Sequence, residues 1–490
     1  MKYLEFYSGI GGHRCAINEL VERSSSTSST SSAIHVERSS STSSSIHSNC
    51  CSCLHNTTPI CLGAFDVSTS ANDTYLANFP NHKPTQKPIE RLTTKQLDTY
   101  NADLWVMSPP CQPYTRQRAN QPSSKKDVND RRAASFTHLT TVLAEMSNPP
   151  RFILLENVVG FETSESCRNW LSTLSRCKYQ VDQFHLSPIQ FGIPNNRPRY
   201  FCIAKRLQSS HQCTESNVDT YNKSKSSSGT ASNGSKSDKS DSSNNNDNND
   251  NNDSSNNNDN NDNNKTTTPS TTLHTSLKSF LQKKQRNVTC QCWLNNTFTS
   301  PSSSGPSTLF SYLEYQGQSH TNMSSSLVPL SMLSRSFSEV VDLVTPSSTT
   351  SCCFTKSYGT YLKGTGSLVV MEKELGDSIS LLGGSSNTIE EMNRKKMTES
   401  NGSEGESGSE QRPIKRVKTE LSTPEEPWHI KFGTDRVRYF TPKEISKLLG
   451  FPSTHVFHES VSLKKKYALL GNSLHVGTVA RLLHVLLSDE

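Results

Sequence analysis

A cysteine between prolines, in residues 108–113 (SPPCQP), is the first candidate for chemistry in this chain. It follows the apolar run 103–107 (DLWVM), whose length and composition predict a short buried strand. The two prolines before Cys111 cannot donate to a sheet and force a rigid, extended turn. Ligands of open α/β sheets bind beyond the carboxyl ends of strands, and Cys111 stands at such an end. A thiolate there would be a strong nucleophile if its pKa fell below about 8.5, whereas the alternative is a structural cysteine in a proline-rich loop.

The amino terminus predicts a strand, a glycine-rich turn and a helix. Residues 2–7 (KYLEFY) alternate and are rich in β-formers, residues 8–12 (SGIGG) follow, and a helical pattern runs from Arg14 to Val21. This layout brings backbone N–H groups against a nucleotide-like ligand, and glycines leave room for that approach. The turn does not match G-x-G-x-x-G, so no phosphate is implied, and a tight turn without any ligand would use the same residues.

Acidic residues end two further predicted strands. Asp66 follows residues 60–65, where it could accept both hydroxyls of a ribose or instead cap the helix expected over 67–79. Glu156 ends the strand expected over 151–156 (RFILLE). If the sheet is doubly wound, Glu156 lies beside the strand that leads to Cys111.

Two arginines alternate before the last strand that we expect in this part of the chain. Arg197 and Arg199 lie in NNRPRYF, at the start of the strand expected over 199–205. This strand and the one expected over 178–186 would complete a mixed sheet. The alternative for these arginines is an exposed edge strand.

In order, YSGIGG, PPCQP, ENVVGF, NRPRYF and GNSLHVG resemble the cytosine-5 methyltransferases. Residues 351–367 (SCCFTKSYGTYLKGTGS) and 438–452 (RYFTPKEISKLLGFP) are similar to the tRNA aspartic acid methyltransferase family. The resemblance covers residues 1–23, 59–208, 308–370 and 428–487.

The resemblance implies an α/β, class I S-adenosylmethionine-dependent methyltransferase fold, with a Rossmann-like mixed sheet, helices on both faces and a small target-recognition lobe. It implies methylation of cytosine C5 in tRNA, at cytosine 38 in the anticodon loop of tRNA-Asp, through a covalent bond from Cys111 to C6. A DNA cytosine-5 methyltransferase with the same site is the alternative. The implied catalytic residues are Cys111, Glu156, Arg197 and Arg199.

The resemblance also assigns binding residues. For the cofactor S-adenosylmethionine they are Tyr7, Ile10, Gly11, Gly12, Asp66, Ile89, Glu90, Ser108 and Ser473. For the nucleic acid, the expected contacts are Arg116, Arg118, Lys125, Arg131, Cys353 and Lys356. Each basic residue of the loop after Cys111 could equally be part of a solvated loop.

Composition limits how much of the chain can fold. Only 31% of its 490 residues are hydrophobic, and Ser, Thr, Asn and Asp crowd into blocks that bury too little apolar surface to offset ordering entropy. We therefore expect a first catalytic part over 1–208 with an insertion at 24–58, linkers at 209–275 and 371–427, a recognition lobe at 276–370 and a C-terminal catalytic part at 428–490.

Charge and cysteine usage bear on partners and compartment. A net charge of +6 fits a nucleic-acid partner without requiring one. The fourteen cysteines lack disulfide-like spacing, so we expect a reduced, intracellular protein without a metal site, although residues 50–53 (CCSC) and 290–292 (CQC) admit zinc as the alternative. No apolar run reaches the roughly 18 residues of a membrane span.

Basic clusters at 393–396 (NRKK) and 413–418 (PIKRVK) resemble a nuclear import signal, so we expect the cytoplasm and also the nucleus. We expect a monomer. Two other classes stay open: a catalytically idle binding protein, and, on fold alone, a nicotinamide-dependent dehydrogenase, which would leave PPCQP unexplained.

Overall fold

The computed structural model describes residues 1–29, 58–114, 127–207, 272–283, 307–314, 326–333, 341–371 and 436–488. All of them belong to one compact unit, Met1–Leu207 with Pro269–Glu490. Several sequence predictions lie outside these residues: the contacts Arg116, Arg118 and Lys125, the cysteine groups 50–53 and 290–292, the two basic clusters, and most of the insertion and the two linkers.

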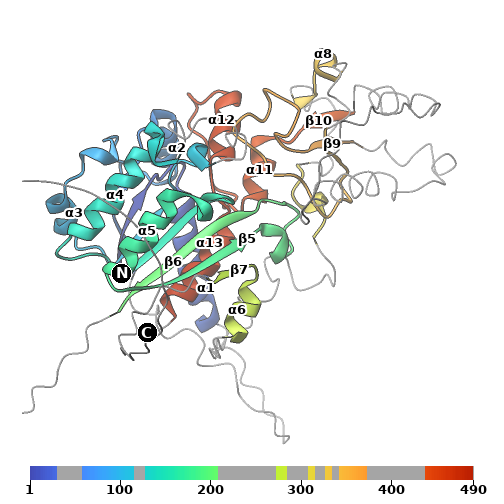
Figure 1. Cartoon of the computed structure of the whole chain (residues 1–490). Coiled ribbons are helices and arrows are strands. Elements are labelled where there is room, and N and C mark those ends of the chain that lie inside the picture. The colour runs from blue at the N-terminus through green and yellow to red at the C-terminus, as the bar shows by residue number, and fades with distance from the viewer. Residues whose placement is uncertain are drawn as a thin grey trace, which may run out of the picture. The chain divides into compact units, whose positions relative to one another are not determined.

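A seven-stranded mixed sheet forms the centre of this unit, in the order β2-β1-β3-β4-β6-β5-β7 (Figure 1). Its strands are β1 (Lys2–Phe6), β2 (Ile60–Phe65), β3 (Leu104–Met107), β4 (Phe152–Val158), β5 (Tyr179–Leu186), β6 (Arg199–Arg206) and β7 (Leu273–His274). β1 to β4 pair in parallel, and β6 runs antiparallel to both of its neighbours. The mixed sheet and the adjacency of the Cys111 and Glu156 strands are confirmed.

The edge-strand alternative for Arg197 and Arg199 is wrong. β6 pairs with β4 along one side and with β5 along the other, so Arg199 begins an internal strand. Among the described residues the short β7 takes the outer position next to β5, and its two residues fall in the range that we expected to be linker.

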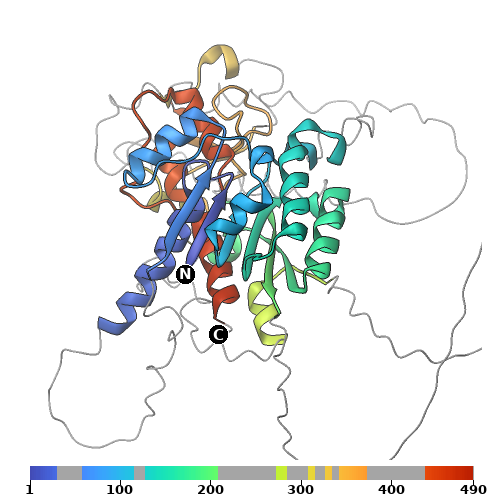
Figure 2. The same ribbon diagram turned by 90° about the vertical axis from the view of Figure 1, so that its left-hand side faces the viewer.

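Helices cover both faces of the sheet (Figure 2). On one face α1 (Gly12–Ser29) packs along α13 (Val476–Leu487), and α6 (Leu277–Lys283) places Phe280 against Phe184 of β5. On the other face lie α3 (Thr94–Tyr100), α4 (Ala134–Glu145) and α5 (Glu165–Arg176). Two separate cores result, because successive side chains of a strand point to opposite faces.

The alternation is visible in β1. Tyr3 belongs to the core under α1 and α13, whereas Leu4 and Phe6 belong to the core under α3, α4 and α5. Glu5, between them, faces the α1 side and is completely buried. An acid in the centre of an apolar strand is costly to bury unless it is neutral or paired.

The C-terminal residues also contribute to a second, three-stranded sheet, in the order β10-β9-β8. Its strands are β8 (Leu343–Val344), β9 (Leu368–Val370) and β10 (Val437–Tyr439). β10, from the C-terminal part of the chain, therefore pairs with a strand from the range expected for the recognition lobe. Arg438 of β10 forms a buried ion pair with Glu444, in which Nη1 lies 2.8 Å from Oε2.

The remaining helices of the described residues are short. They are α2 (Thr69–Asn78), α8 (Leu330–Leu333), α11 (Pro442–Leu448) and α12 (Leu463–Gly471). Single 3₁₀ turns span Ile89–Arg91, Gln112–Tyr114, Asp127–Asn129, Arg131–Ala133, Phe161–Thr163, Pro188–Phe191 and Leu309–Ser311. α11 begins at Pro442, because the preceding Thr441 forms a reciprocal capping box with Glu444.

None of the helices in the described ranges is both long and apolar enough to cross a membrane.

Candidate active site

A cavity of about 290 Å³ opens at the carboxyl ends of the parallel strands. The glycine turn after β1, the loops after β2, β3 and β4, the start of β6 and the end of α12 line it. The predicted residues that it brings together are Tyr7, Ile10, Gly12, Asp66, Ser108, Cys111, Glu156, Arg197, Arg199 and Ser473. Segments separated by more than 400 residues thus meet at one place, where open α/β sheets hold their ligands.

Cys111 follows the two prolines and precedes a single 3₁₀ turn that Tyr114 closes, with its N–H 3.0 Å from the Cys111 carbonyl oxygen. Burial raises the pKa of the Cys111 thiol, Glu156 adds to the rise, and Arg199 and Arg197 oppose it. The lowered pKa on which the sequence interpretation depended is therefore not found in this site. Burial outweighs the arginines, so the thiol holds its proton more firmly than an ordinary cysteine does.

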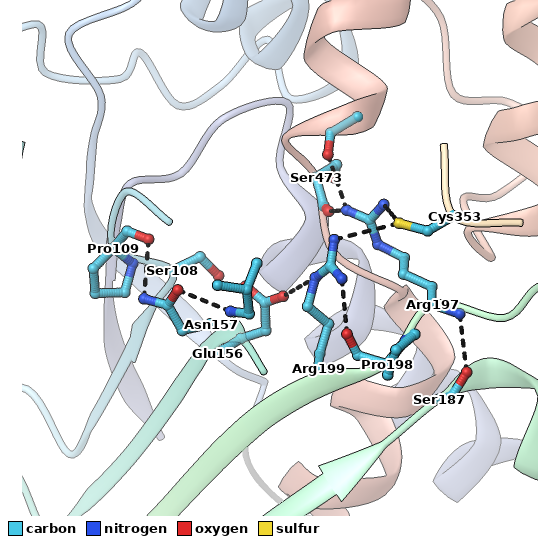
Figure 3. Close-up of polar contacts among 12 residues, drawn as sticks. Ser108, Pro109, Glu156, Asn157, Ser187, Arg197, Pro198, Arg199, Cys353 and Ser473 are labelled. Carbon is cyan, nitrogen blue, oxygen red and sulfur yellow. Dashed lines mark hydrogen bonds and ion pairs between the residues drawn. The ribbon is translucent and has the colours of Figure 1, made fainter. Parts of the chain in front are cut away.

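Glu156 lies on β4, next to the strand that leads to Cys111. Its Oε1 is 3.3 Å from Nε of Arg199 (Figure 3), and both side chains are largely buried. Burial raises the pKa of Glu156, although Arg199, Arg197 and a hydrogen bond with Ser108 lower it. The carboxyl group therefore takes up a proton more readily than an ordinary glutamate does, which suits a hydrogen-bond donor.

Asn157 ties this strand end to the cysteine loop, and sequence reasoning did not single it out. Its Nδ2 donates to the carbonyl oxygen of Pro109 at 3.3 Å, and its Oδ1 accepts from the Val158 N–H at 2.8 Å. The sequence feature that could have identified Asn157 is its position directly after Glu156 in the motif ENVVGF. Asn157 fixes the distance between the strand that carries Glu156 and the loop that carries Cys111.

Arg197 is completely enclosed and joins three parts of the chain. Nη1 donates to the Phe354 carbonyl oxygen at 3.0 Å and to Sγ of Cys353 at 3.3 Å, and Nη2 donates to the carbonyl oxygens of Gly471, at 3.1 Å, and Ser473 (Figure 3). Burial and Arg199 lower the pKa of Arg197. Its guanidinium group is occupied by main-chain acceptors, so Arg199 is the arginine better placed to meet a substrate.

Cys353 lies between the two arginines rather than in the cavity lining. Nη2 of Arg199 is 3.6 Å from its sulfur, in addition to the contact from Arg197. Burial opposes ionisation, but the two guanidinium groups outweigh it and lower the pKa of Cys353. The neighbouring main chain of Thr355 and Lys356 packs directly on Gly471, where any Cβ would stand 2.2 Å from the Lys356 nitrogen.

Asp66 holds the glycine turn in place. Its two carboxyl oxygens accept from the Gly9 N–H at 2.9 Å and the Ser68 N–H at 2.8 Å. The alternative role as helix cap belongs instead to Ser68, whose side chain accepts from Ala71 at the start of α2. Each carboxylate oxygen has a second lone pair, so Asp66 can still accept ribose hydroxyls in the cavity.

The other predicted binding residues lie outside the cavity lining. Gly11 has φ +87°, and a Cβ there would stand 2.4 Å from the Phe79 ring, so packing requires this glycine. Ile89 is buried in the core under α3 and α4, and Glu90 is exposed. Arg131 and Lys356 are also exposed, where they are free to meet a large ligand.

The cavity also has lining residues that sequence reasoning missed, among them His13, Val67, Ser68, Lys465 and Asn472. The lysine run in α12 (Lys464–Lys466) was a usable signal for Lys465. His13 had no signal, because its partner Ser108 is 95 residues away in sequence.

Comparison with known proteins agrees with this geometry. The model of the C-5 cytosine-specific DNA methylases matches residues 51–488, and the chain belongs to that family. It is a cytosine-C5 methyltransferase of the class I fold, and the resemblance to the tRNA methyltransferases drawn from its motifs is confirmed.

Three proteins to which the chain is similar are the following. A tRNA (cytosine(38)-C(5))-methyltransferase of Rattus norvegicus is 31% identical, covering 87% of this chain and 92% of its own. A DNA (cytosine-5)-methyltransferase of Dictyostelium discoideum is 29% identical over 100% of this chain and 95% of its own. The crystal structure of a Spodoptera frugiperda DNMT2 mutant is 25% identical, with a TM-score of 0.57 over 99% of each chain.

Proposed function

We propose that this protein transfers a methyl group to C5 of cytosine in tRNA, with Cys111 as the nucleophile and cytosine 38 of the tRNA-Asp anticodon loop as the target. The observation that carries the proposal is that Cys111, Glu156 and Arg199 face the cavity that Asp66 and the glycine turn also line. The relative of Rattus norvegicus supports the substrate, since its name specifies cytosine 38 of tRNA.

The cytosine chemistry follows from these side chains. C5 of cytosine is a poor nucleophile until the Cys111 sulfur adds to C6 and turns the ring into an enamine. Glu156, whose raised pKa favours the protonated carboxyl, would give N3 its hydrogen bond or proton during this attack. Arg199, 3.3 Å from Glu156, would offset charge that develops at O2. After methylation, loss of the C5 proton and elimination free Cys111.

The cavity fits S-adenosylmethionine, which would supply the methyl group when bound. Gly9 lines the cavity with φ 53°, a backbone conformation that favours glycine, so no side chain stands at this point of the turn. Asp66 keeps lone pairs for ribose hydroxyls, and Ser473 reaches the same cavity from the C-terminal part. The proposed cofactor residues Ile89 and Glu90 lie away from this lining.

The nucleic acid must bring the base out of its stack to reach a cysteine on a loop. Unpaired bases of an RNA loop make this step easier. Lys465 lines the cavity, and Lys356 and Arg131 are exposed, so all three are candidate phosphate contacts. DNA is the second candidate substrate, because the Dictyostelium discoideum relative is named a DNA (cytosine-5)-methyltransferase.

Bisulfite sequencing of tRNA and genomic DNA from cells with and without the gene tests the proposal. The expected result is loss of methylation at tRNA-Asp cytosine 38 and unchanged genomic DNA. Unchanged tRNA with lost DNA methylation would transfer the activity to the second candidate.

A further inference from the structure

A buried carboxyl group lies below the active site, on the strand that leads to the glycine turn. Glu5 of β1 is 0% exposed, and its Oε2 accepts from the Tyr75 hydroxyl at 3.1 Å. Its Oε1 has no partner at full hydrogen-bond geometry in the described part of the chain, and the carboxyl group has only longer contacts there, with the Arg14 backbone N–H and with His13. A carboxyl oxygen left without a partner in an apolar core costs free energy, so its retention calls for a reason.

The open oxygen points toward His13, the second residue of α1. Nδ1 of His13 is 3.7 Å from Oε1 of Glu5, and the ring itself is 1% exposed. On the other side of the ring, Nε2 is 3.3 Å from the Ser108 hydroxyl oxygen. The imidazole therefore joins Glu5 to Ser108 through its two nitrogens.

Ser108 completes the connection to the active site. It lies in the loop between β3 and Cys111, it lines the same cavity as Glu156, and its hydroxyl group lowers the pKa of that carboxyl group. Figure 3 shows Ser108 and Glu156 next to each other at the end of β4. A continuous row of polar groups thus runs from Glu5 through His13 and Ser108 to Glu156.

We propose that Glu5 stores a proton for Glu156 and that His13 and Ser108 carry it. This proposal rests on the role given to Glu156 above. In the transfer, the Glu5 Oε1–H bond breaks as Nδ1–H forms on His13, and Nε2–H breaks as a new O–H forms on Ser108. The original Ser108 proton passes to Glu156. Glu5 is left ionised, Glu156 becomes neutral, and His13 changes only its tautomer, so no other reactant is needed.

The electrostatics suit such a store. Burial raises the pKa of Glu5 to about 8, against the Tyr75 hydroxyl and the charge and backbone N–H of Arg14, so the carboxyl group is protonated at neutral pH. Burial lowers the pKa of His13 to about 3, so the imidazole is neutral and free to switch tautomers. The ionisable groups that face Glu5 are Tyr3, His13, Arg14, Cys15, Cys61, Asp66 and Tyr75. The positive charge of Arg14 offsets the negative charge that remains on Glu5 after the transfer. For the transfer itself, the 3.7 Å distance between Nδ1 of His13 and Oε1 of Glu5 must shorten to hydrogen-bond distance.

The test measures kcat and both Michaelis constants of the full chain with tRNA and S-adenosylmethionine from pH 6 to 9.5. Glu5→Gln keeps the size of the side chain but holds no transferable proton. Its kcat should fall about a hundredfold or more at pH 7, the low end of general acid–base contributions, with Michaelis constants unchanged within about twofold. In the wild type, kcat should fall as the pH rises through about 8, where Glu5 loses its proton. In Glu5→Gln this fall should be absent. His13→Leu should lower kcat by the same factor as Glu5→Gln. The variant with both substitutions should lose no more activity than either single variant, because both substitutions interrupt one path.

The matched control is Tyr75→Phe, which touches the other oxygen of Glu5 and should keep wild-type kcat within about twofold. Glu156→Gln is measured in parallel. If it loses activity while Glu5→Gln keeps wild-type kcat and its alkaline limb, the proton store is overturned and the role of Glu156 stands. If both variants keep wild-type kcat, the role of Glu156 itself is overturned. Multiplying losses in the double variant would mean two separate structural defects and would also overturn the relay.

Discussion

Arg199 and Glu156 form a buried ion pair at the start of β6 and the end of β4, with Nε 3.3 Å from Oε1. The pair exists because β6 runs antiparallel to β4, which places the first residue of one strand at the end of the other. Both groups act on Cys111 in opposite directions, since Arg199 lowers the pKa of the thiol and Glu156 raises it. The two members of the pair therefore have opposing effects on the ionisation of the Cys111 thiol, the step that thiolate attack requires.

This balance predicts opposite shifts in two variants. Arg199→Gln removes a positive charge, so the pKa of Cys111 should rise and its alkylation by iodoacetamide should move to higher pH. Glu156→Gln removes a negative charge and should move the same curve to lower pH. Peptide mass spectrometry isolates Cys111 from the other free cysteines. Alkylation curves that stay at the wild-type position in both variants would show that burial alone governs this thiol.

Arg197 and Arg199 should respond differently to substitution by lysine. Arg197→Lys leaves the main-chain acceptors of Phe354, Gly471 and Ser473 short of donors, at about 1–3 kcal/mol for each unsatisfied group. We expect its free energy of unfolding to fall by about 2 kcal/mol or more. Arg199→Lys should keep most of its stability and lose kcat. Denaturant unfolding of both variants decides this, and equal stability would assign Arg197 to the chemistry.

Asp66→Ala should raise the Michaelis constant for S-adenosylmethionine while leaving the chemistry of Cys111 intact. Asp66→Asn is the matched control, because an amide oxygen can still accept one of the two backbone hydrogen bonds. Its affinity should fall between that of wild type and Asp66→Ala. If calorimetry finds equal cofactor affinity in all three proteins, Asp66 serves only to hold Gly9 and Ser68.

Glu5 makes stability depend on pH in a defined direction. Its pKa is about 8 when folded against 4.5 for an ordinary glutamate, so its contribution is present below pH 4.5 and is lost as the pH rises through 8. Glu5→Gln has no such proton to lose. Relative to wild type, the variant should therefore gain on the order of 2–4 kcal/mol of unfolding free energy between pH 5 and 9. Thermal unfolding at both pH values measures it, and parallel curves would show that Glu5 does not titrate there.

Local sequence patterns predicted the strands that carry the site. The apolar runs before Cys111 and Glu156, and the run before Asp66, each fold as a parallel strand of one sheet. The acid or cysteine that ends each run therefore reaches the same edge. This worked because strand length and turn residues are encoded within a few positions.

Other features depend on contacts between distant segments, which short-range patterns do not carry. Arg197 finds its acceptors up to 276 residues away, so its use as a connection between chain segments had no local signal. The raised pKa of Cys111 comes from burial under parts that assemble only in the fold. By contrast, α5 (Glu165–Arg176) did have a local signal that was not used, because Cys167, Trp170 and Leu174 recur at helical spacing and form its buried stripe.

The central claim is that Cys111 acts as the nucleophile in methylation of a tRNA cytosine. Its direct test is methyl transfer from labelled S-adenosylmethionine to purified tRNA-Asp, followed by nucleoside analysis, with wild type and Cys111→Ala compared at equal cofactor binding. We predict 5-methylcytidine with the wild type and less than about one per cent of that rate with the variant, because removing a nucleophile costs many powers of ten. Label found in 5-methylcytidine at a near wild-type rate with Cys111→Ala would contradict the account.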